Sequence, residues 1–132
     1  MASIQVERLV GVPAETAWKE LRQPEAAPRL FAGVLVEGDM EGDVRRVVFA
    51  DGLEVRERIV TVDDASRRLV YTVLGGHFEH HSAAMQILPD GEDACRFVWI
   101  SDFLPDEHAA MVGPLMDAGA EAFGRNVGAA SV

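Results

Sequence analysis

Short turns separate a series of strand-like runs in the middle of the chain, and this spacing restricts the folds that the chain can adopt. Apolar and polar residues alternate in six runs, at residues 34–37, 44–50, 53–62, 69–74, 78–88 and 95–103. Asp-Gly and Pro-Asp-Gly sequences, typical of hairpin turns, lie between several of these runs. Because parallel strands need a crossover of about a dozen residues or more, connections this short require antiparallel neighbours.

A further strand and two short helical segments precede these runs. Residues 4–10 alternate in the same way and predict the first strand. Pro13 suits the first turn of a helix, and residues 14–22 follow with apolar side chains at helical spacing. Two more prolines limit a second helical piece, which is expected to end near Phe31.

The last part of the chain changes to the helical period. Asp106 is a suitable N-cap, and the helix is expected to end near Asn126. Pro114 lies near the polar side of this helix and is expected to bend it. The apolar and small residues on the other side are Met111, Val112, Leu115, Met116, Gly119, Ala122 and Phe123. The pattern predicts an amphipathic helix with one buried side.

The lengths of these elements match. A helix of this length and the longest strands each extend about 30 Å. An antiparallel sheet of that height with one apolar side twists strongly and can curve around a single helix. We therefore expect an α+β fold of one domain over residues 1–132, in which a curved antiparallel sheet of about seven strands wraps round the long C-terminal helix.

Composition and charge disfavour several classes of partner. The chain has 132 residues with a formal charge of −10, which repels nucleic acid and anionic lipid surfaces. Basic residues at 45–46, 56–58 and 67–68 are interpreted as solvated strand faces. No apolar run approaches the roughly 20 residues that span a bilayer, so no membrane insertion is expected. With no signal peptide at the N-terminus and with Cys95 as the single cysteine, a cytoplasmic protein is the default expectation.

Small and flexible residues line the expected interface between helix and sheet. The long helix is rich in alanine and glycine, and Met85, Met111 and Met116 are flexible side chains that can adapt to a guest. One interpretation is an internal cavity. The alternative is that small residues let the helix and the sheet approach closely and leave no space.

Several motifs, in this order, are similar to those of a known family. They lie at residues 12–18, 42–46, 51–58, 63–71 and 97–105. Over nearly its whole length the chain resembles the START-like helix-grip (SRPBCC) superfamily, in particular a small bacterial branch described as polyketide cyclase/dehydrase or lipid transport. The resemblance implies a cavity between the concave face of the sheet and the long helix, and no obligatory metal or organic cofactor. It does not specify a reaction, because this fold hosts enzymes, receptors and carriers.

The resemblance also places Trp99 and Glu57 on the concave face. A carboxyl group in an apolar cavity holds a proton more readily than in water, so Glu57 is a candidate acid or base. The alternative is a salt bridge to a neighbouring strand, for example with Arg46. Tyr71 is a candidate donor to a carbonyl or enolate oxygen, and the alternative is core packing with its hydroxyl at the rim.

Adjacent His80 and His81 must point to opposite faces of a strand. His81 shares its face with apolar residues and is therefore the inward candidate, acting as an acid or base with Glu57. A metal site on His77, Glu79 and His81 is disfavoured, because three such side chains span roughly 13 Å along one strand.

These considerations predict a binding protein with catalytic candidates Glu57, Tyr71 and His81. The residues expected to contact the ligand are Trp99, Phe97, Ser101, Phe103, Met85, Met111, Leu115, Met116 and His108. We expect an apolar guest, polyketide-like, aromatic or lipid-like, and a cyclisation or dehydration step that needs no cofactor. The alternatives are a non-catalytic carrier and, more weakly, a structural module whose cavity is incidental. The oligomeric state stays open, a homodimer included.

Overall fold

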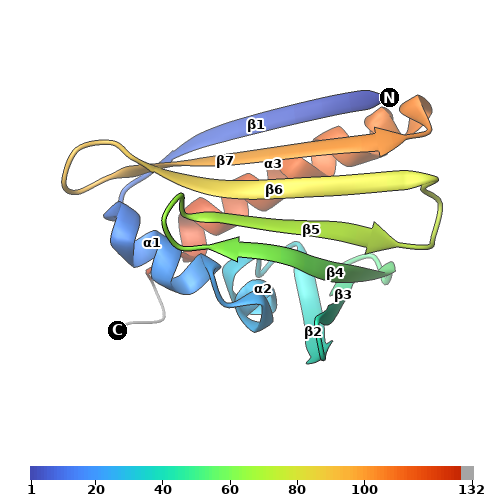
Figure 1. The fold of residues 1–132 in the computed structure, drawn as a ribbon, viewed down its shortest axis with the longest axis horizontal. Helices are drawn as coiled ribbons and strands as arrows, with labels where there is room; N and C mark the ends of the chain where they lie inside the picture. Colours follow the sequence, from blue (N-terminus) through green and yellow to red (C-terminus); the bar gives the residue numbers. More distant parts are fainter. Residues whose placement is uncertain (129–132) are drawn as a thin grey trace.

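The computed structural model describes residues 1–128. Its seven strands form one antiparallel sheet, and a long helix lies along one side of it (Figure 1). The strands are β1 (Ala2–Val10), β2 (Leu35–Glu41), β3 (Val44–Phe49), β4 (Glu54–Asp63), β5 (Arg68–Leu74), β6 (His80–Pro89) and β7 (Cys95–Leu104). The helical segments are α1 (Ala14–Leu21), η1 (Pro24–Ala26), α2 (Ala27–Leu30), η2 (Asp106–His108) and α3 (Ala109–Asn126).

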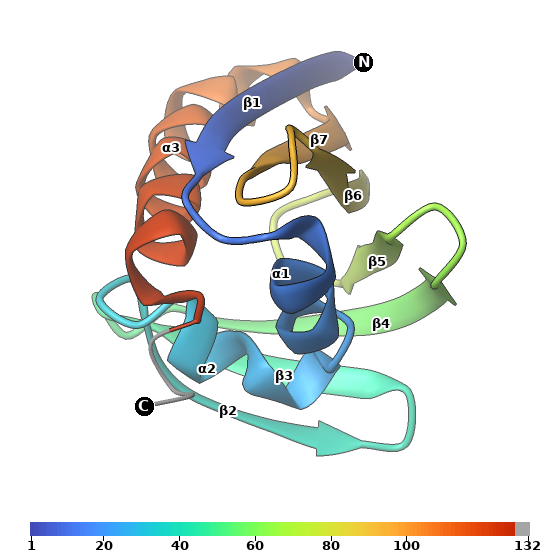
Figure 2. The same cartoon turned by 90° about the vertical axis from the view of Figure 1, so that its left-hand side faces the viewer.

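The strand order is β1-β7-β6-β5-β4-β3-β2, so the first strand pairs with the last and every other neighbour is a hairpin. Figure 2 shows the sheet curving from β1 round to β3 and β2, with α3 across the open side and α1 and α2 at one end. The predicted helix-grip fold is confirmed, with a seven-stranded sheet and short helices after the first strand.

The turn between β3 and β4 sets the register of the two strands that matter most for the site. Gly52 has a φ of 94°, a left-handed conformation that favours glycine. The side chain of Asp51 accepts a hydrogen bond from the backbone N–H of Leu53 at 3.0 Å, which closes the turn. The Phe49 N–H donates to the Leu53 oxygen at 2.8 Å, so residues 50–52 form the loop, and counting outward from this pair places Arg45 of β3 directly opposite Glu57 of β4.

The start of the long helix differs from the prediction. Asp106 does not cap α3, because residues Asp106–His108 form the separate turn η2, and neither segment has a side-chain cap hydrogen bond. The Asp106 carboxylate instead lies 3.3 Å from the N-terminal amine of Met1. Pro114 lies inside α3 with an exposed side chain, as its place on the helix predicted.

Two apolar clusters hold α3 against the concave face. In the larger one, Phe97 of β7 stacks on Phe123 of α3 with ring centroids 4.4 Å apart. In the smaller one, Phe103 packs with Val112 and Met116 near the start of the helix. Helix and sheet therefore meet closely near both ends of α3, and the space between these contacts forms the site.

Candidate functional site

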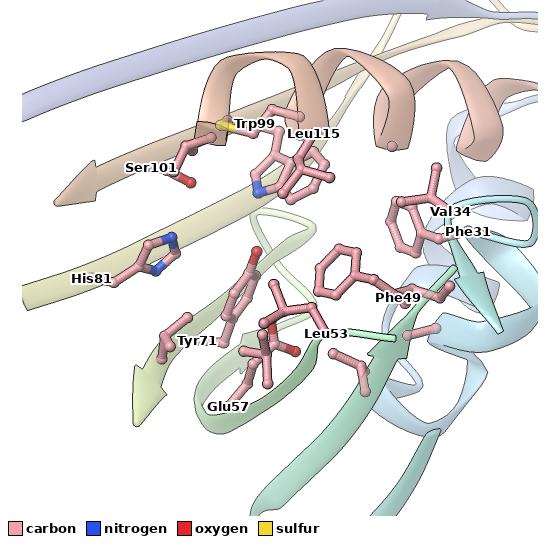
Figure 3. A pocket seen from close by; sticks show the side chains of 18 of the residues that line it. Phe31, Val34, Phe49, Leu53, Glu57, Tyr71, His81, Trp99, Ser101 and Leu115 are labelled. Atoms are coloured by element: carbon pink, nitrogen blue, oxygen red, sulfur yellow. The ribbon is translucent and has the colours of Figure 1, made fainter. Parts of the chain in front are cut away.

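A cavity of about 110 Å³ lies between the concave face of the sheet and α3. Strands β3 to β7, the segment before β2 and α3 supply its walls (Figure 3). An engineered apolar cavity of about 150 Å³ holds benzene, so this smaller space takes at most about one aromatic ring, and any substituent on the ring would extend into the rim. The expectation of a cavity is confirmed, and the close approach at a small residue that was the alternative is found at Gly119, against Trp99.

Most of the predicted site residues line this cavity. These are Glu57, Tyr71, His81, Met85, Trp99, Ser101, Met111, Leu115 and Met116. Met111, 37% exposed, and the half-buried Leu115 lie on α3, and the half-buried Phe49 and Leu53 lie on the β3–β4 hairpin. These side chains form a partly exposed part of the cavity rim.

Three predicted ligand contacts lie outside the lining. Phe97 faces inward as predicted but is covered by Phe123, and neither ring is exposed. Phe103 is also fully buried, behind Phe78, which takes its place in the wall. The imidazole Nε2 of His108 lies 2.9 Å from the backbone oxygen of His77 and so closes the loop before β6 instead of facing the cavity.

An ion pair forms the charged part of the cavity wall. The Arg45 Nε donates to Glu57 Oε1 at 2.9 Å, and both side chains are about nine-tenths buried. A second Arg45 nitrogen, Nη1, donates to the backbone oxygen of Pro24 at 3.0 Å. The strand-to-strand salt bridge considered for Glu57 is thus present, but with a different arginine from the one named.

Arg46 was the wrong partner because adjacent residues on a strand face opposite ways. Arg46 lies on the convex face, where it pairs with Glu37, Asp39 and Glu54. Arg45, expected on a solvated face, is only 7% exposed. The interpretation of residues 45–46 as solvated holds for Arg46 alone.

Tyr71 stands beside this ion pair. The Arg45 guanidinium carbon lies 5.5 Å from the centroid of the Tyr71 ring, which is 4% exposed. Burial raises the pKa of the Tyr71 phenol, and the Glu57 carboxylate raises it further, while Arg45 opposes both effects. The hydroxyl therefore stays protonated at neutral pH and can act as a hydrogen-bond donor.

His81 is a buried, neutral side chain. It is 8% exposed, and its Nδ1 has no hydrogen-bond partner in the described part of the chain. Burial lowers the pKa of its imidazole to about 4, with a smaller contribution from His80 in the same direction. At neutral pH His81 is thus not a cationic acid, and it offers the cavity an uncharged donor or acceptor.

Stability below pH 7 is expected to depend on His81. The imidazole titrates near 6.5 in an unfolded chain and at about 4 in the folded one. Since the unfolded state binds the proton first, stability is complete above about pH 6.5 and falls as the pH drops toward 4. The expected loss between pH 7 and pH 5 is about 2 kcal/mol, measured by urea unfolding.

The His81→Gln variant should lose this component of the pH dependence, while His80→Gln, on the exposed face, should keep it. Equal pH profiles for wild type and His81→Gln would show that His81 is accessible to water and protonates freely.

The sequence pattern did not predict several of the residues that line the cavity. Phe31 and Val34 come from the segment before β2, Phe49 and Leu53 from the β3–β4 hairpin, and Gly119 from α3. Phe31, Val34 and Leu53 lie in irregular segments, which carry no alternation that would reveal an inward side chain, whereas alternation along β3 could have revealed Phe49, which shares a face with Arg45 and Val47. Gly119 was noted only as a small residue, although its contact with Trp99 shapes the cavity.

The described residues contain no group of three or more His, Cys, Asp or Glu side chains arranged to hold a metal ion. None of the helices in residues 1–128 is both long and apolar enough to cross a membrane.

The comparison with known families agrees with the geometry of this site. A family model described as "Polyketide cyclase / dehydrase and lipid transport" matches residues 1–130. The chain belongs to this family. The resemblance noted in the sequence is therefore confirmed. The description of the polyketide cyclase/dehydrase and lipid transport family includes both enzymes and transport proteins. Membership in the family therefore does not show whether this protein is an enzyme or a carrier.

Solved structures share the fold at low sequence identity. XoxI from Bacillus cereus is 18% identical with a TM-score of 0.86 over 96% of each chain. Norcoclaurine synthase from Thalictrum flavum, in complex with dopamine and hydroxybenzaldehyde, is 20% identical with a TM-score of 0.74 over 94% of this chain and 84% of that one. The di-domain ARO/CYC BexL of the BE-7585A pathway is 16% identical with a TM-score of 0.82, over 96% of this chain and 46% of that one. Identities this low show the shared fold alone, and no curated protein matches the sequence.

Proposed function

We propose that the protein binds a small, largely apolar ring compound in the cavity between the sheet and α3. The observation that carries this proposal is the open space of about 110 Å³, walled mainly by apolar side chains and bordered by the Arg45–Glu57 pair. A mostly apolar pocket with a few placed polar groups is the usual composition of a small-molecule site. A longer polyketide-like guest would need the rim formed by α3 and the β3–β4 hairpin to open.

Methionine methyl signals test this binding directly. Met85, Met111 and Met116 line the cavity, whereas Met1 and Met40 do not and act as internal controls. In protein labelled with ¹³C at the methionine methyls, acetophenone should shift the three cavity signals saturably and leave the two controls unchanged. Shifts that are equal at all five methyls, or absent, would refute binding in this cavity.

We further propose that the bound compound undergoes a proton transfer that begins a cyclisation or dehydration, with no cofactor. Glu57 would take a proton from the carbon next to a carbonyl, and the electron pair would move onto the carbonyl oxygen. Tyr71, kept protonated by its surroundings, would donate a hydrogen bond to that oxygen. The enolate carbon would then attack a second carbonyl carbon of the same molecule and close the ring with a new C–C bond. The alkoxide so formed would take the proton held by Glu57, and this hydroxyl would leave as water with a second hydrogen from the carbon next to the first carbonyl, which leaves a C=C bond.

Binding without turnover is the second candidate, and one observation favours it. Glu57 already accepts a charge-assisted hydrogen bond from Arg45 at 2.9 Å, so one carboxylate oxygen is engaged inside the protein before any guest binds. In a carrier, the same ion pair would only orient the polar end of the guest.

Hydrogen–deuterium exchange at the methyl group of acetophenone separates the two candidates. An enzyme should accelerate this exchange in D₂O, and Glu57→Gln should slow it by about 10²-fold or more while acetophenone still binds. Glutamine keeps an oxygen that can accept from Arg45, and the methionine signals report whether the variant remains folded. A rate equal to that of buffer alone in the wild type, with binding intact, would favour the carrier.

A further inference from the structure

One buried hydrogen-bond donor in the cavity wall has no partner. The indole Nε1 of Trp99 is inaccessible to water and meets no acceptor in hydrogen-bond geometry among residues 1–128. Nearly all buried polar groups in folded proteins are paired, so such an atom in a cavity wall points to an acceptor on the guest. His81 Nδ1 is the other unpaired side-chain atom found in the same wall.

The Trp99 nitrogen faces the hydroxyl group of Tyr71. Figure 3 shows the indole N–H directed across the cavity toward this hydroxyl, with the His81 ring to one side. A side-chain hydrogen-bond interaction with Trp99, too poorly aligned to satisfy Nε1, lowers the pKa of Tyr71, and burial and Glu57 outweigh it. An N–H donor from β7 and an O–H donor from β5, both on the concave face of the sheet with β6 between them, therefore approach the same volume.

The position of the indole is fixed by what lies behind it. A Cβ atom added to Gly119 of α3 would lie 2.7 Å from Cζ3 of Trp99, closer than non-bonded carbons allow. The Phe31 ring lies beside the indole at a centroid distance of 5.9 Å, and Phe97 at 6.1 Å. The six-membered ring of Trp99 thus packs against the backbone of α3 at Gly119, where no side chain intervenes. This contact fixes the orientation of the indole and the direction of its Nε1–H.

We propose that Trp99 Nε1–H and the Tyr71 hydroxyl together bind one oxygen atom of the ligand. The inference rests on the proposed binding function and narrows its ligand class to ring compounds with a carbonyl or enolate oxygen, as opposed to hydrocarbons or lipid tails. In a site built to donate hydrogen bonds, an analogue without the oxygen leaves the donors unpaired and binds more weakly.

Two probes of nearly equal shape test whether the site binds an oxygen atom of the ligand. Acetophenone carries a carbonyl where α-methylstyrene carries a CH₂ group. The chain has two tryptophans, and Trp18 Nε1 already donates to Asp64 at 2.9 Å, so its indole signal is an internal control. In ¹H–¹⁵N spectra, acetophenone should move the Trp99 indole proton downfield, α-methylstyrene should not, and Trp18 should stay unchanged with both.

The Trp99→Phe variant gives a second measurement. It keeps an aromatic ring but loses the N–H, so the ratio of the affinity for acetophenone to that for α-methylstyrene should fall by about 10-fold, whatever the smaller ring does to both affinities. If both probes bind to wild type with the same response at Trp99, the oxygen-binding inference is overturned and the cavity function stands. If neither probe shifts the cavity methionines, the proposed function itself fails, and the inference fails with it.

Discussion

Replacing Glu57 by leucine is expected to lower the free energy of unfolding by about 3–5 kcal/mol. The substitution leaves the Arg45 guanidinium in a wall where its side chain is only 8% exposed. An unpaired buried charge has lost its hydration without gaining a partner, so the folded state bears the full cost. Urea unfolding at neutral pH measures the difference.

The double variant Arg45→Met with Glu57→Leu should recover most of that loss, because two apolar side chains of similar size replace the pair. Arg46→Met is the matched control on the same strand. Its carboxylate partners on the convex face are more than half exposed, so removing this arginine should change stability far less. If the decreases in the free energy of unfolding caused by Arg45→Met and by Glu57→Leu simply add in the double variant, the two side chains do not stabilise each other.

Gly119→Ala is expected to lower the affinity for the ligand strongly while leaving the fold intact. The new Cβ would lie 2.7 Å from the Trp99 ring, which must tilt into a cavity of only about 110 Å³. The tilted Trp99 ring would occupy part of the space that the ligand needs. Affinity for α-methylstyrene should therefore fall by about 10-fold or more, because the ring must move back against the new methyl group before the ligand can bind. Calorimetric titration gives the affinity. The gain in helix propensity, about 1 kcal/mol, offsets part of the strain in stability.

Gly113→Ala is the control on the same helix. A Cβ there would meet only the end of Ile4 at 3.7 Å, an ordinary contact, and Gly113 is not part of the cavity wall. This variant should keep the wild-type affinity and gain up to about 1 kcal/mol in stability. Equal affinities for Gly119→Ala and wild type would mean that Trp99 does not define the space in which the ligand binds.

The register of β3 and β4 was not within reach of the turn sequence alone. A two-residue turn at Asp51-Gly52 would pair Ala50 with Leu53 and so place Arg46 opposite Glu57. In the structure the loop has three residues, 50–52, with the Phe49 N–H donating to the Leu53 oxygen at 2.8 Å, and this shift by one residue places Arg45 opposite Glu57 on the same face. The family resemblance put Trp99 on the concave face, and alternation along the strands then put Ser101 and Met85 there; all three line the cavity.

The sequence could not show which of the inward-facing side chains reach the open space of the cavity. Alternation gives Phe97, Trp99 and Phe103 the same face, but only Trp99 contacts the open space. Which inward side chain is covered depends on where Phe123 and Phe78 pack, and that follows from the tilt of α3 and from the loop before β6. The capping pattern at Asp106 failed for a related reason, since a turn of 3-10 helix, η2, precedes α3.

Diffraction from crystals of the protein under xenon pressure tests the central claim that the interior is open. Xenon enters apolar cavities of about this size without needing a specific partner. The expected result is a xenon peak among Trp99, Met85 and Met116, between the sheet and α3. Side chains that fill this region completely, with no xenon peak there, would contradict both the binding and the catalytic proposals.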